Sequence, residues 1–534
     1  MQNIIKNLTL SKKEIFLWFL GFSVLTLSFL PLITNFTWGN HDWLSLKTDG
    51  HLKAGFIEGR ISQYLFLYLF LDSHILPILN TGLGFLIYSL TIVLFTTRFF
   101  EFDINNKKIY FIIPLIASLP YTNEITFFQF IILSQLIWTF TIFMSLMFAK
   151  KATKKHHIIY TILSTFFLFL SIGGYPASSN LFIISLILYL SQIYSSTKNI
   201  TITLKKSIPF IVSLFISFTT LYFTYKYLQN TGQMIKLYNN ETISLQELIL
   251  NLPKSFMLSI TSLITPQPFF SLIYKTLSSF IIFSFIFYYL KQSSSLKDFL
   301  IRLLFFFAII LGIKFSALLT KETPQTFFAT SDPVFFMIRT DFYSLPILIL
   351  FSLCFLTKNT KTYIKNIISV VITILIFSNI NSNLYYSKIN ILAFRSEINL
   401  TERISDRIKK SPNYNPNTLY TLIQATDLSF RPRFYHKPIP TYQAFYTLHS
   451  PFTRYWIPND YYNFYAIQPF VSQQVSINPK DINDEMINYF TNQIETWPSS
   501  NSVYLDNKYA IITLSPKGKN MLTEQFKSIK SIKQ

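Results

Sequence analysis

A cluster of acidic, basic and histidine side chains follows the first long apolar run, in residues 38–60. This stretch contains Asp42, Asp49 and Glu58, although only 13% of the chain is charged. A carboxylate held partly out of water is a stronger base than a solvated one, because desolvation disfavours its charged form. Asp42 closely follows the first apolar run, so we expect it to face the membrane surface and to deprotonate an acceptor hydroxyl.

Two other interpretations of Asp42 stay open: a solvated loop acid, or an N-cap for a helix that begins at Trp43. Asp49 is expected to be structural or to bind a substrate hydroxyl. His41 and His51 flank the two aspartates, so a divalent ion is conceivable there. Because the spacing of these four side chains is irregular, the pattern favours an ordinary loop over a metal site. We expect no required cofactor.

Arg60 ends the same stretch and opens the next apolar segment. An arginine at a helix start opposes the helix dipole, so stability alone does not explain its position. A guanidinium that grips a phosphate, or one that pairs with Asp42, explains it better. The alternative is an arginine that snorkels to lipid headgroups.

Four further ionisable side chains lie within apolar runs or at their ends. Arg339 and Asp341 stand at the start of one run, where they pair with each other or Arg339 holds a lipid phosphate. Glu124 is expected to bind substrate, or to stabilise a helix N-terminus as an acid in its first turn. Lys314 lies within a run and is either a functional cation or a snorkelling one.

The composition indicates the class of protein. The 534 residues are 50% hydrophobic and 18% aromatic, which is more apolar surface than so few charges can cover in a soluble domain. Apolar runs of about 18 or more residues recur, and such runs form membrane-spanning helices because lipid satisfies no backbone hydrogen bonds. Much of the net charge of +21 lies in lysine clusters between the runs, which indicates membrane orientation rather than nucleic acid.

The positive-inside rule orients the chain. Lys12 and Lys13 precede the first run and place the N-terminus in the cytoplasm. Eleven spans then alternate lysine-rich inner loops with outer turns that are nearly free of Lys and Arg. The expected spans are residues 15–36, 79–100, 109–120, 125–148, 158–172, 177–193, 208–228, 269–290, 299–319, 342–356 and 364–380. Residues 61–76 and 255–268 are expected to lie at the membrane interface.

The composition changes after residue 380, where polar and charged residues replace the apolar runs. The sequence predicts a transmembrane domain over residues 1–380 and a soluble extracytoplasmic α+β domain over residues 385–534. In the second domain it predicts a helix at 397–409 and strands at 418–424 and 502–514. Cys354 is the single cysteine and excludes an intramolecular disulfide.

These residues resemble the GT-C superfamily of membrane glycosyltransferases, and within it the bacterial and phage O-antigen glucosyltransferase-like family. In that family an acid or a pair of acids follows the first span, and Gly-Arg closes the first outer loop. Here these motifs read N-H-D-W at 40–43 and E-G-R at 58–60. The likeness continues in the outer turn with Glu124, the G-G-Y-P turn at 173–176, and Arg339. The chain departs from the family pattern at His41, where a second acid is common.

The resemblance implies transfer of a sugar, such as glucose, from a polyprenyl-phosphate donor to a cell-surface glycan such as O-antigen. The reaction would take place on the outer side of the bacterial inner membrane. Asp42 would act as the base, and Arg60 and Arg339 would stabilise the departing lipid phosphate. The secondary candidates for substrate binding are Glu124, Asp49 and Lys47. The expected partners are the lipid-linked sugar, the glycan acceptor and membrane lipids, without nucleic acid.

Two alternatives remain. A transporter or flippase for lipid-linked glycans would place ionisable residues or broken helices near mid-membrane, whereas most of the expected spans lack interior charge. An O-antigen polymerase-like enzyme would share the lipid donor but usually has a long outer loop between late spans. Nucleotide-binding and soluble-hydrolase motifs are absent from the sequence, which disfavours a nucleotide-driven pump or a cytosolic nucleotide-sugar enzyme.

Overall fold

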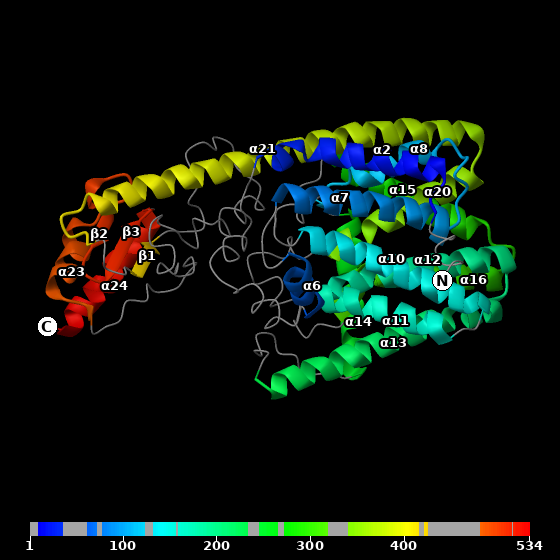
Figure 1. Ribbon diagram of the computed structural model, residues 1–534, viewed down its shortest axis with the longest axis horizontal. Helices are drawn as coiled ribbons and strands as arrows, with labels where there is room; N and C mark the ends of the chain where they lie inside the picture. The colour runs from blue at the N-terminus through cyan, green and yellow to red at the C-terminus, as the bar shows by residue number, and fades with distance from the viewer. Residues whose placement is uncertain are drawn as a thin grey trace. The chain divides into compact units, whose positions relative to one another are not determined.

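A computed structural model describes residues 9–35, 61–71, 77–122, 132–155, 158–232, 245–264, 272–318, 340–415, 421–425, 481–514 and 516–533. These residues form two compact units (Figure 1), and the boundary between the units follows Lys388. We describe each unit by itself.

The first unit is a bundle of helices (Figure 1). Its α-helices are α2 (Lys12–Ser28), α3 (Leu30–Thr34), α6 (Ile61–Leu71), α7 (Pro77–Leu94), α8 (Ile109–Ala117), α10 (Ile132–Lys155), α11 (Ile158–Gly174), α12 (Ser179–Thr197), α13 (Ile200–Asn230), α14 (Leu245–Ile264), α15 (Leu272–Lys291), α16 (Leu296–Ile313), α17 (Phe315–Leu318), α20 (Leu345–Asn359) and the first part of α21 (Thr362–Lys409). A π-helix (Phe95–Phe99) continues α7, and a 3-10 turn (Pro176–Ser178) precedes α12. α10 packs against α7, α11 and α13, while α12 packs against α16 and α15 against α20.

Seven helices within the described residues are long and apolar enough to cross a membrane. They cover Ile78–Phe99, Ile132–Lys154, Pro176–Thr197, Ile200–Asn230, Ile273–Lys291, Thr340–Asn359 and Thr362–Lys388. Each coincides with an expected span, so the multi-pass helical class is confirmed. The other expected spans are shorter or more charged, with 17 residues in α2, 17 in α11 and nine in α8. The count of eleven spans therefore stays a prediction.

Several helix boundaries differ from the predicted ones. α14 begins at Leu245 rather than at residue 255, and α13 begins at Ile200 rather than at 208. Pro253 and Pro209 lie inside these helices. The helix predicted at residues 397–409 is not separate, because it forms the last part of the 48-residue helix α21. No Pro or Gly lies within α21, so its sequence contains none of the usual helix breakers.

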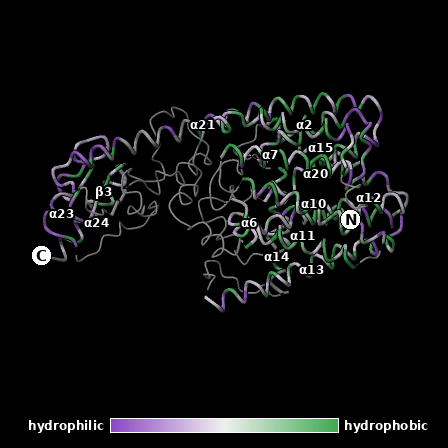
Figure 2. Tube along the Cα trace, viewed as in Figure 1, coloured by the Kyte–Doolittle hydropathy of each residue, from purple (hydrophilic) through white to green (hydrophobic). Residues whose placement is uncertain are grey.

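One end of the bundle gathers the basic loops, and we call it the basic end. The contacts there are the pairs Glu14–Arg98 (2.6 Å), Glu101–Lys150 (2.8 Å) and Asp298–Lys198 (2.7 Å), and a 2.5 Å hydrogen bond from Lys13 to Asn105. Figure 2 shows the same concentration of hydrophilic residues at the right-hand end of the bundle. Each of these residues belongs to a loop or to a helix end next to it that the sequence assigns to the cytoplasmic side.

The first turns of several helices meet at the other end, which we call the opposite end. The last turn of α10 lies at the basic end, where Lys150 donates to the carbonyl oxygen of Arg98 at 3.1 Å. The last turns of α12 and α15 lie there too, since Lys198 pairs with Asp298 and Tyr289 accepts a hydrogen bond from Arg302. The first turns of these helices therefore lie at the opposite end. Polar side chains in these turns form the candidate site.

The second unit contains the end of α21, a short helix α23 (Asp484–Asn488) that continues into a π-helical turn (Tyr489–Gln493), and α24 (Pro516–Lys533). Its three-stranded sheet has the order β1 (Thr421–Ala425), β3 (Tyr509–Thr513), β2 (Val503–Leu505). β1 pairs with β3 in parallel, and β2 pairs with β3 antiparallel. The single strand predicted at 502–514 is thus a hairpin of two strands. A mixture of helices and sheet agrees with the α+β prediction.

The two faces of this sheet bury alternate residues, as a period of two requires. Ile511 packs with Phe490 and Phe526 on the side covered by α24. Ile512 packs with Ile404 and Ile408 of α21 on the other side. The rings of Phe490 and Phe526 stack at 4.5 Å. The end of α21 is therefore part of the core of the second unit.

Candidate functional site

All the site residues predicted from the sequence lie outside the described residues: Asp42, Arg60, Arg339, Glu124, Asp49 and Lys47. The same holds for His41 and His51. Two of the predicted residues, Arg60 and Arg339, have a chain neighbour that is described. Ile61, the residue after Arg60, begins α6, and Thr340 follows Arg339. Ile61 packs on Leu228 near the end of α13. The roles of the predicted residues stay predictions, and the described part of the chain contains a separate candidate site.

A buried ion pair forms the centre of that site. Lys314 Nζ lies 2.7 Å from Asp341 Oδ1, with the two side chains only 3% and 0% exposed. Lys314 also donates to the hydroxyl of Thr340 at 2.5 Å. A lysine that snorkels would carry its ammonium group to an exposed surface, so the snorkelling interpretation of Lys314 is wrong. Charges buried this deeply in a membrane protein are costly, and they are usually paired and functional.

The ion pair lies at a break between two helices. α16 ends at Ile313 and α17 begins at Phe315. Lys314 between them has φ −120° and ψ 35°, which is not helical. A break frees backbone groups that must find other partners. Asn180 Oδ1 accepts from the Ser316 backbone N–H at 2.7 Å, and Ser255 donates to the carbonyl oxygen of Lys314 at 3.1 Å. Side chains of α12 and α14 thus hold the break open.

A second buried lysine lies in the first turn of α15. Lys275 is 3% exposed, and it is close enough to Asp341 and Lys314 for their charges to act on it. Its ammonium group donates to the carbonyl oxygen of Ser262, in the last turn of α14. That contact makes Lys275 a cap for the carbonyl end of α14, which is a structural role. Its burial beside Lys314 gives the site a second cation as well.

The electrostatics of this region favour an anion. Two buried lysines, Lys275 and Lys314, share one buried acid, Asp341, among the described residues of the cluster. Lys275 and Asn180 lie in the first turns of α15 and α12, and Asp341 lies just before α20. Helix N-termini carry partial positive charge and unsatisfied N–H groups. The cluster therefore carries an excess of positive charge in a low-dielectric setting, where one negative ligand group would balance it.

Aromatic side chains surround the cluster. The rings of Tyr121 and Tyr274 lie 6.3 Å apart, edge to face, and both residues are about 1% exposed. The Tyr343 ring lies 5.7 Å from that of Tyr175, in the turn after α11. The hydroxyl of Tyr343 donates to the side-chain oxygen of Gln135, in the first turn of α10. Tyr343 therefore joins the Asp341 segment to a second group of polar residues on α10.

The G-G-Y-P turn makes room for this arrangement. A Cβ atom on Gly174 would lie 2.2 Å from the indole of Trp138, and one on Gly173 would lie 2.8 Å from the hydroxyl of Ser62. Neither separation is possible without movement of the neighbour. α11 ends at Gly174 and a 3-10 turn follows, so the G-G-Y-P sequence forms a turn, as predicted. The two glycines allow α6 and α10 to approach the end of α11 closely.

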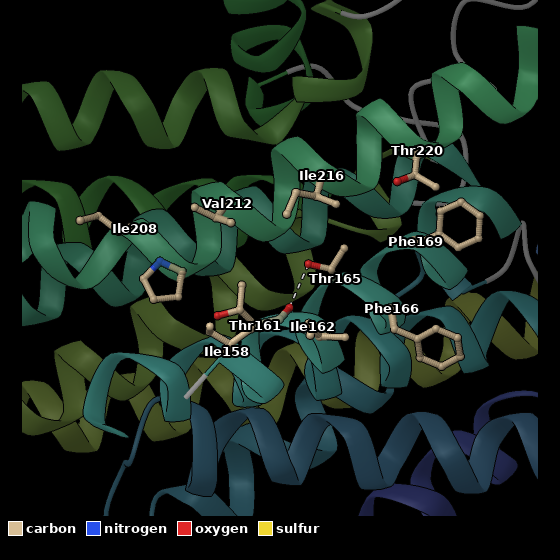
Figure 3. A pocket seen from close by; sticks show the side chains of 11 residues that line it. Ile158, Thr161, Ile162, Thr165, Phe166, Phe169, Ile208, Val212, Ile216 and Thr220 are labelled. Atoms are coloured by element: carbon tan, nitrogen blue, oxygen red, sulfur yellow. Dashed lines mark hydrogen bonds between the residues drawn. The ribbon is translucent and has the colours of Figure 1, made fainter. Parts of the chain in front are cut away.

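A groove of about 650 Å³ runs between α11 and α13 (Figure 3). Its lining residues are Ile158, Thr161, Ile162, Thr165, Phe166, Phe169, Ile208, Pro209, Val212, Ile216 and Thr220. The hydroxyl of Thr165 donates to the carbonyl oxygen of Thr161 at 2.9 Å, so it is satisfied within the helix. None of these lining side chains is ionisable, so the groove suits hydrocarbon rather than a reacting group.

The sequence interpretation missed several residues of this site. Lys275, Asn180 and Gln135 stand within apolar runs, and each occupies the first turn of its helix. Their signal in the sequence was a polar residue just inside the start of an apolar run. Lys275 lies within the expected span at 269–290, and the expectation that most spans lack interior charge did not take it into account. Comparison with family models, curated proteins and solved structures gave no match to this chain.

Proposed function

We propose that this chain is a GT-C-type membrane glycosyltransferase. It would move a sugar from a polyprenyl-phosphate donor to a cell-surface glycan such as O-antigen, on the outer side of the bacterial inner membrane. The observation that carries the proposal is the buried cluster of Lys275, Lys314 and Asp341. The cluster carries a net positive charge. Its member Asp341 lies two residues after Arg339, which the family resemblance assigns to binding the lipid phosphate.

The proposed topology rests on the distribution of basic residues. Lys-rich loops gather at the basic end, which the positive-inside rule would place in the cytoplasm. The cluster lies at the opposite end, so the site would face outward. Cytosolic nucleotide sugars do not reach that side, which makes a lipid-linked donor the natural substrate. The apolar groove between α11 and α13 offers a surface that a lipid chain would cover.

In the proposed reaction, an acceptor hydroxyl attacks the anomeric carbon of the donor sugar. The bond from that carbon to the phosphate oxygen breaks, and polyprenyl phosphate leaves with the bonding electrons. Asp42 takes the hydroxyl proton, and a single displacement inverts the anomeric centre. Negative charge develops on the leaving phosphate, where the two buried lysines, with Arg60 and Arg339, would stabilise it.

A transporter of lipid-linked glycans is the second candidate. The break between α16 and α17 at Lys314, beside a buried ion pair, is a feature that transporters use. The position of the break argues against this candidate. α16 has 18 residues before the break, which is ~27 Å of helix against a hydrocarbon core of ~30 Å. The break therefore lies near one end of the span rather than at the midplane.

The testing experiment is a transfer assay with the purified full chain in lipid nanodiscs. Polyprenyl-phosphate glucose with a labelled sugar is supplied with O-antigen, and labelled glycan is measured. Asp42→Asn is expected to lower the rate by about 10²–10⁴-fold, the usual contribution of a general base. Asp103→Asn is the matched control, because Asp103 is an exposed loop acid near the basic end. Transfer unaffected by Asp42→Asn would refute the catalytic assignment, and donor translocation without transfer would favour the transporter.

A further inference from the structure

Three amide side chains lie in the first turns of neighbouring helices at the opposite end. Gln63 belongs to α6, Asn80 to α7 and Gln135 to α10, and they are 3%, 1% and 3% exposed. α7 packs against α10, and α6 contacts α10 as well. The ring of Phe66, one turn after Gln63, packs edge-on against Trp138, one turn after Gln135. The three helix starts therefore border one another.

Several polar atoms of these amides have no hydrogen-bond partner among the described residues. Asn80 Nδ2 and Oδ1, Gln63 Oε1 and Gln135 Nε2 have no hydrogen-bond partner in the part of the chain that the structure describes. Some buried amides elsewhere in the bundle do have protein partners. Asn383 Nδ2, for example, donates to the carbonyl oxygen of Ser118 at 2.9 Å. Burial of an amide without a partner costs free energy, and such a cost is often kept where a ligand supplies the partner.

The amides lie beside the charged cluster. Gln135 Oε1 accepts from the hydroxyl of Tyr343, which is two residues beyond Asp341. On α7, the ring of Tyr88 packs at a tilt against that of Phe342, with ring centroids 5.4 Å apart. The segment that carries Asp341 thus touches both α10 and α7. A ligand with an anionic group at the lysines would bring its adjoining atoms towards the amides.

The chemistry of the amides selects the ligand class. Each carboxamide offers donors and an acceptor, and a sugar hydroxyl both donates and accepts. The buried polar residues in the first turns of α6, α7 and α10 are Ser62, Gln63, Asn80, Thr81, Ser134 and Gln135. All six are uncharged. A carboxylate or an ammonium group on the ligand would lose water there without gaining an ionic partner, which is unfavourable.

We propose that Gln63, Asn80 and Gln135 form a subsite for a neutral sugar ring, next to a subsite at Lys275 and Lys314 for the phosphate attached to it. The proposal rests on the proposed function and specifies its donor: a phosphate lipid that carries a neutral hexose rather than a uronic acid or an amino sugar. Tyr343 marks the boundary between the two subsites.

The test measures binding to the full chain in nanodiscs. The probes are a short polyprenyl phosphate, the same lipid bearing glucose, and the same lipid bearing glucuronate. The wild-type protein is expected to bind the glucosyl lipid at least about tenfold more tightly than either of the other two, since a hydrogen-bonding site rejects ligands that leave it unpaired. Asn80→Leu is expected to abolish that preference and to keep the affinity for the bare phosphate lipid.

Asn383→Leu is the matched control. It removes a buried asparagine whose amide has a protein partner, so it should lower the melting temperature and keep the preference for glucose. Asn80→Leu should leave the melting temperature unchanged or raise it. The subsite is refuted if Asn80→Leu still prefers glucose, if it lowers the melting temperature as Asn383→Leu does, or if wild type binds the bare and glucosyl lipids equally. Failure of the wild type to bind any of the phosphate lipids would instead refute the proposed function, and this proposal with it.

Discussion

The ammonium group of Lys314 lies 2.7 Å from a carboxylate oxygen of Asp341, at the point where α16 breaks and α17 begins. The pair ties the end of α16 to the segment that leads into α20. Both side chains are buried. A pair in this position fixes where the break occurs. It also places the Asp341 carboxylate close to two lysines, Lys314 and Lys275.

Removal of one member of the pair should destabilise the bundle. Lys314→Met leaves Asp341 buried without its cation, which typically costs about 3–5 kcal/mol. The double variant Lys314→Met with Asp341→Leu should recover much of that loss, because no uncompensated charge remains. Thermal unfolding in detergent measures both. Lys154→Met is the control, since Lys154 lies 4.0 Å from Glu101 with a 68% exposed side chain, and such surface pairs contribute about 0–1 kcal/mol. A double variant less stable than Lys314→Met would contradict this account of the pair.

Lys275 should contribute to anion binding. Lys275→Gln keeps a hydrogen-bond donor near the Ser262 carbonyl but removes the charge, so the affinity for bare polyprenyl phosphate should fall by about tenfold or more. Lys291→Gln, at the exposed basic end of the same helix, should leave the affinity unchanged. Binding titrations in nanodiscs give both values. Equal effects of the two variants would mean that Lys275 serves only to cap α14.

Gly174 should not tolerate alanine. The added methyl group would lie 2.2 Å from the Trp138 indole, and displacement of a packed ring typically costs about 1–3 kcal/mol. Gly82→Ala is the control, because a Cβ on Gly82 of α7 meets nothing within 4 Å. Within a helix that substitution should be neutral or stabilising by about 0.5–1 kcal/mol. Melting temperatures and Trp fluorescence of the two variants should differ accordingly, and a stable Gly174→Ala protein with unchanged fluorescence would speak against the close contact.

The orientation in the membrane can be measured by cysteine labelling. In a Cys354→Ser background, a membrane-impermeant thiol reagent added to intact cells should label Asp49→Cys and Ser500→Cys. It should not label Lys154→Cys, at the exposed basic end, until the membrane is opened. The reason is that lysine-rich loops stay in the cytoplasm. Protection of Ser500→Cys would overturn the extracytoplasmic position predicted for residues 385–534, and labelling of Lys154→Cys would overturn the whole orientation.

The second unit should lose stability in acid. Asp481 Oδ2 accepts hydrogen bonds from Lys508 Nζ and Tyr509 Oη, both at 2.6 Å. The hydrogen bonds from Lys508 and Tyr509 lower the pKa of the Asp481 carboxyl below its usual value. A lowered folded-state pKa stabilises the fold above the unfolded pKa of about 3.9, and this stabilisation is lost as the pH falls through the folded pKa.

Hydrogen exchange of residues 481–533 in the full chain, followed from about pH 7 down to about pH 3, should therefore show faster opening below about pH 4. Asp481→Asn should open faster than wild type at pH 7 and should show a weaker dependence on acid. An identical pH profile for the variant and the wild type would assign the acid sensitivity to other groups.

The sequence alone determined the class of protein and the approximate positions of most helices. Apolar runs long enough to cross lipid must be helical, since each backbone group needs a partner within its own segment. Seven of the spans expected on that basis are helices of sufficient length and hydropathy. Local signals were weaker at the boundaries, where α14 and α13 begin before the expected positions and continue through Pro253 and Pro209. The residues assigned by family resemblance, Asp42 and Arg60 first among them, lie outside the described parts of the chain.

Only the tertiary structure decided which polar side chains meet. Lys275, Lys314 and Asp341 come from three separate apolar runs, and no local pattern fixes which helices become neighbours. Their meeting depends on the packing of α12, α14, α15, α16 and α20, which is a property of contacts far apart in sequence. The same is true of the hydrogen bond from Tyr343 to Gln135. A lone lysine in an apolar run has several explanations, and its buried partner is what distinguishes a site from a snorkelling side chain.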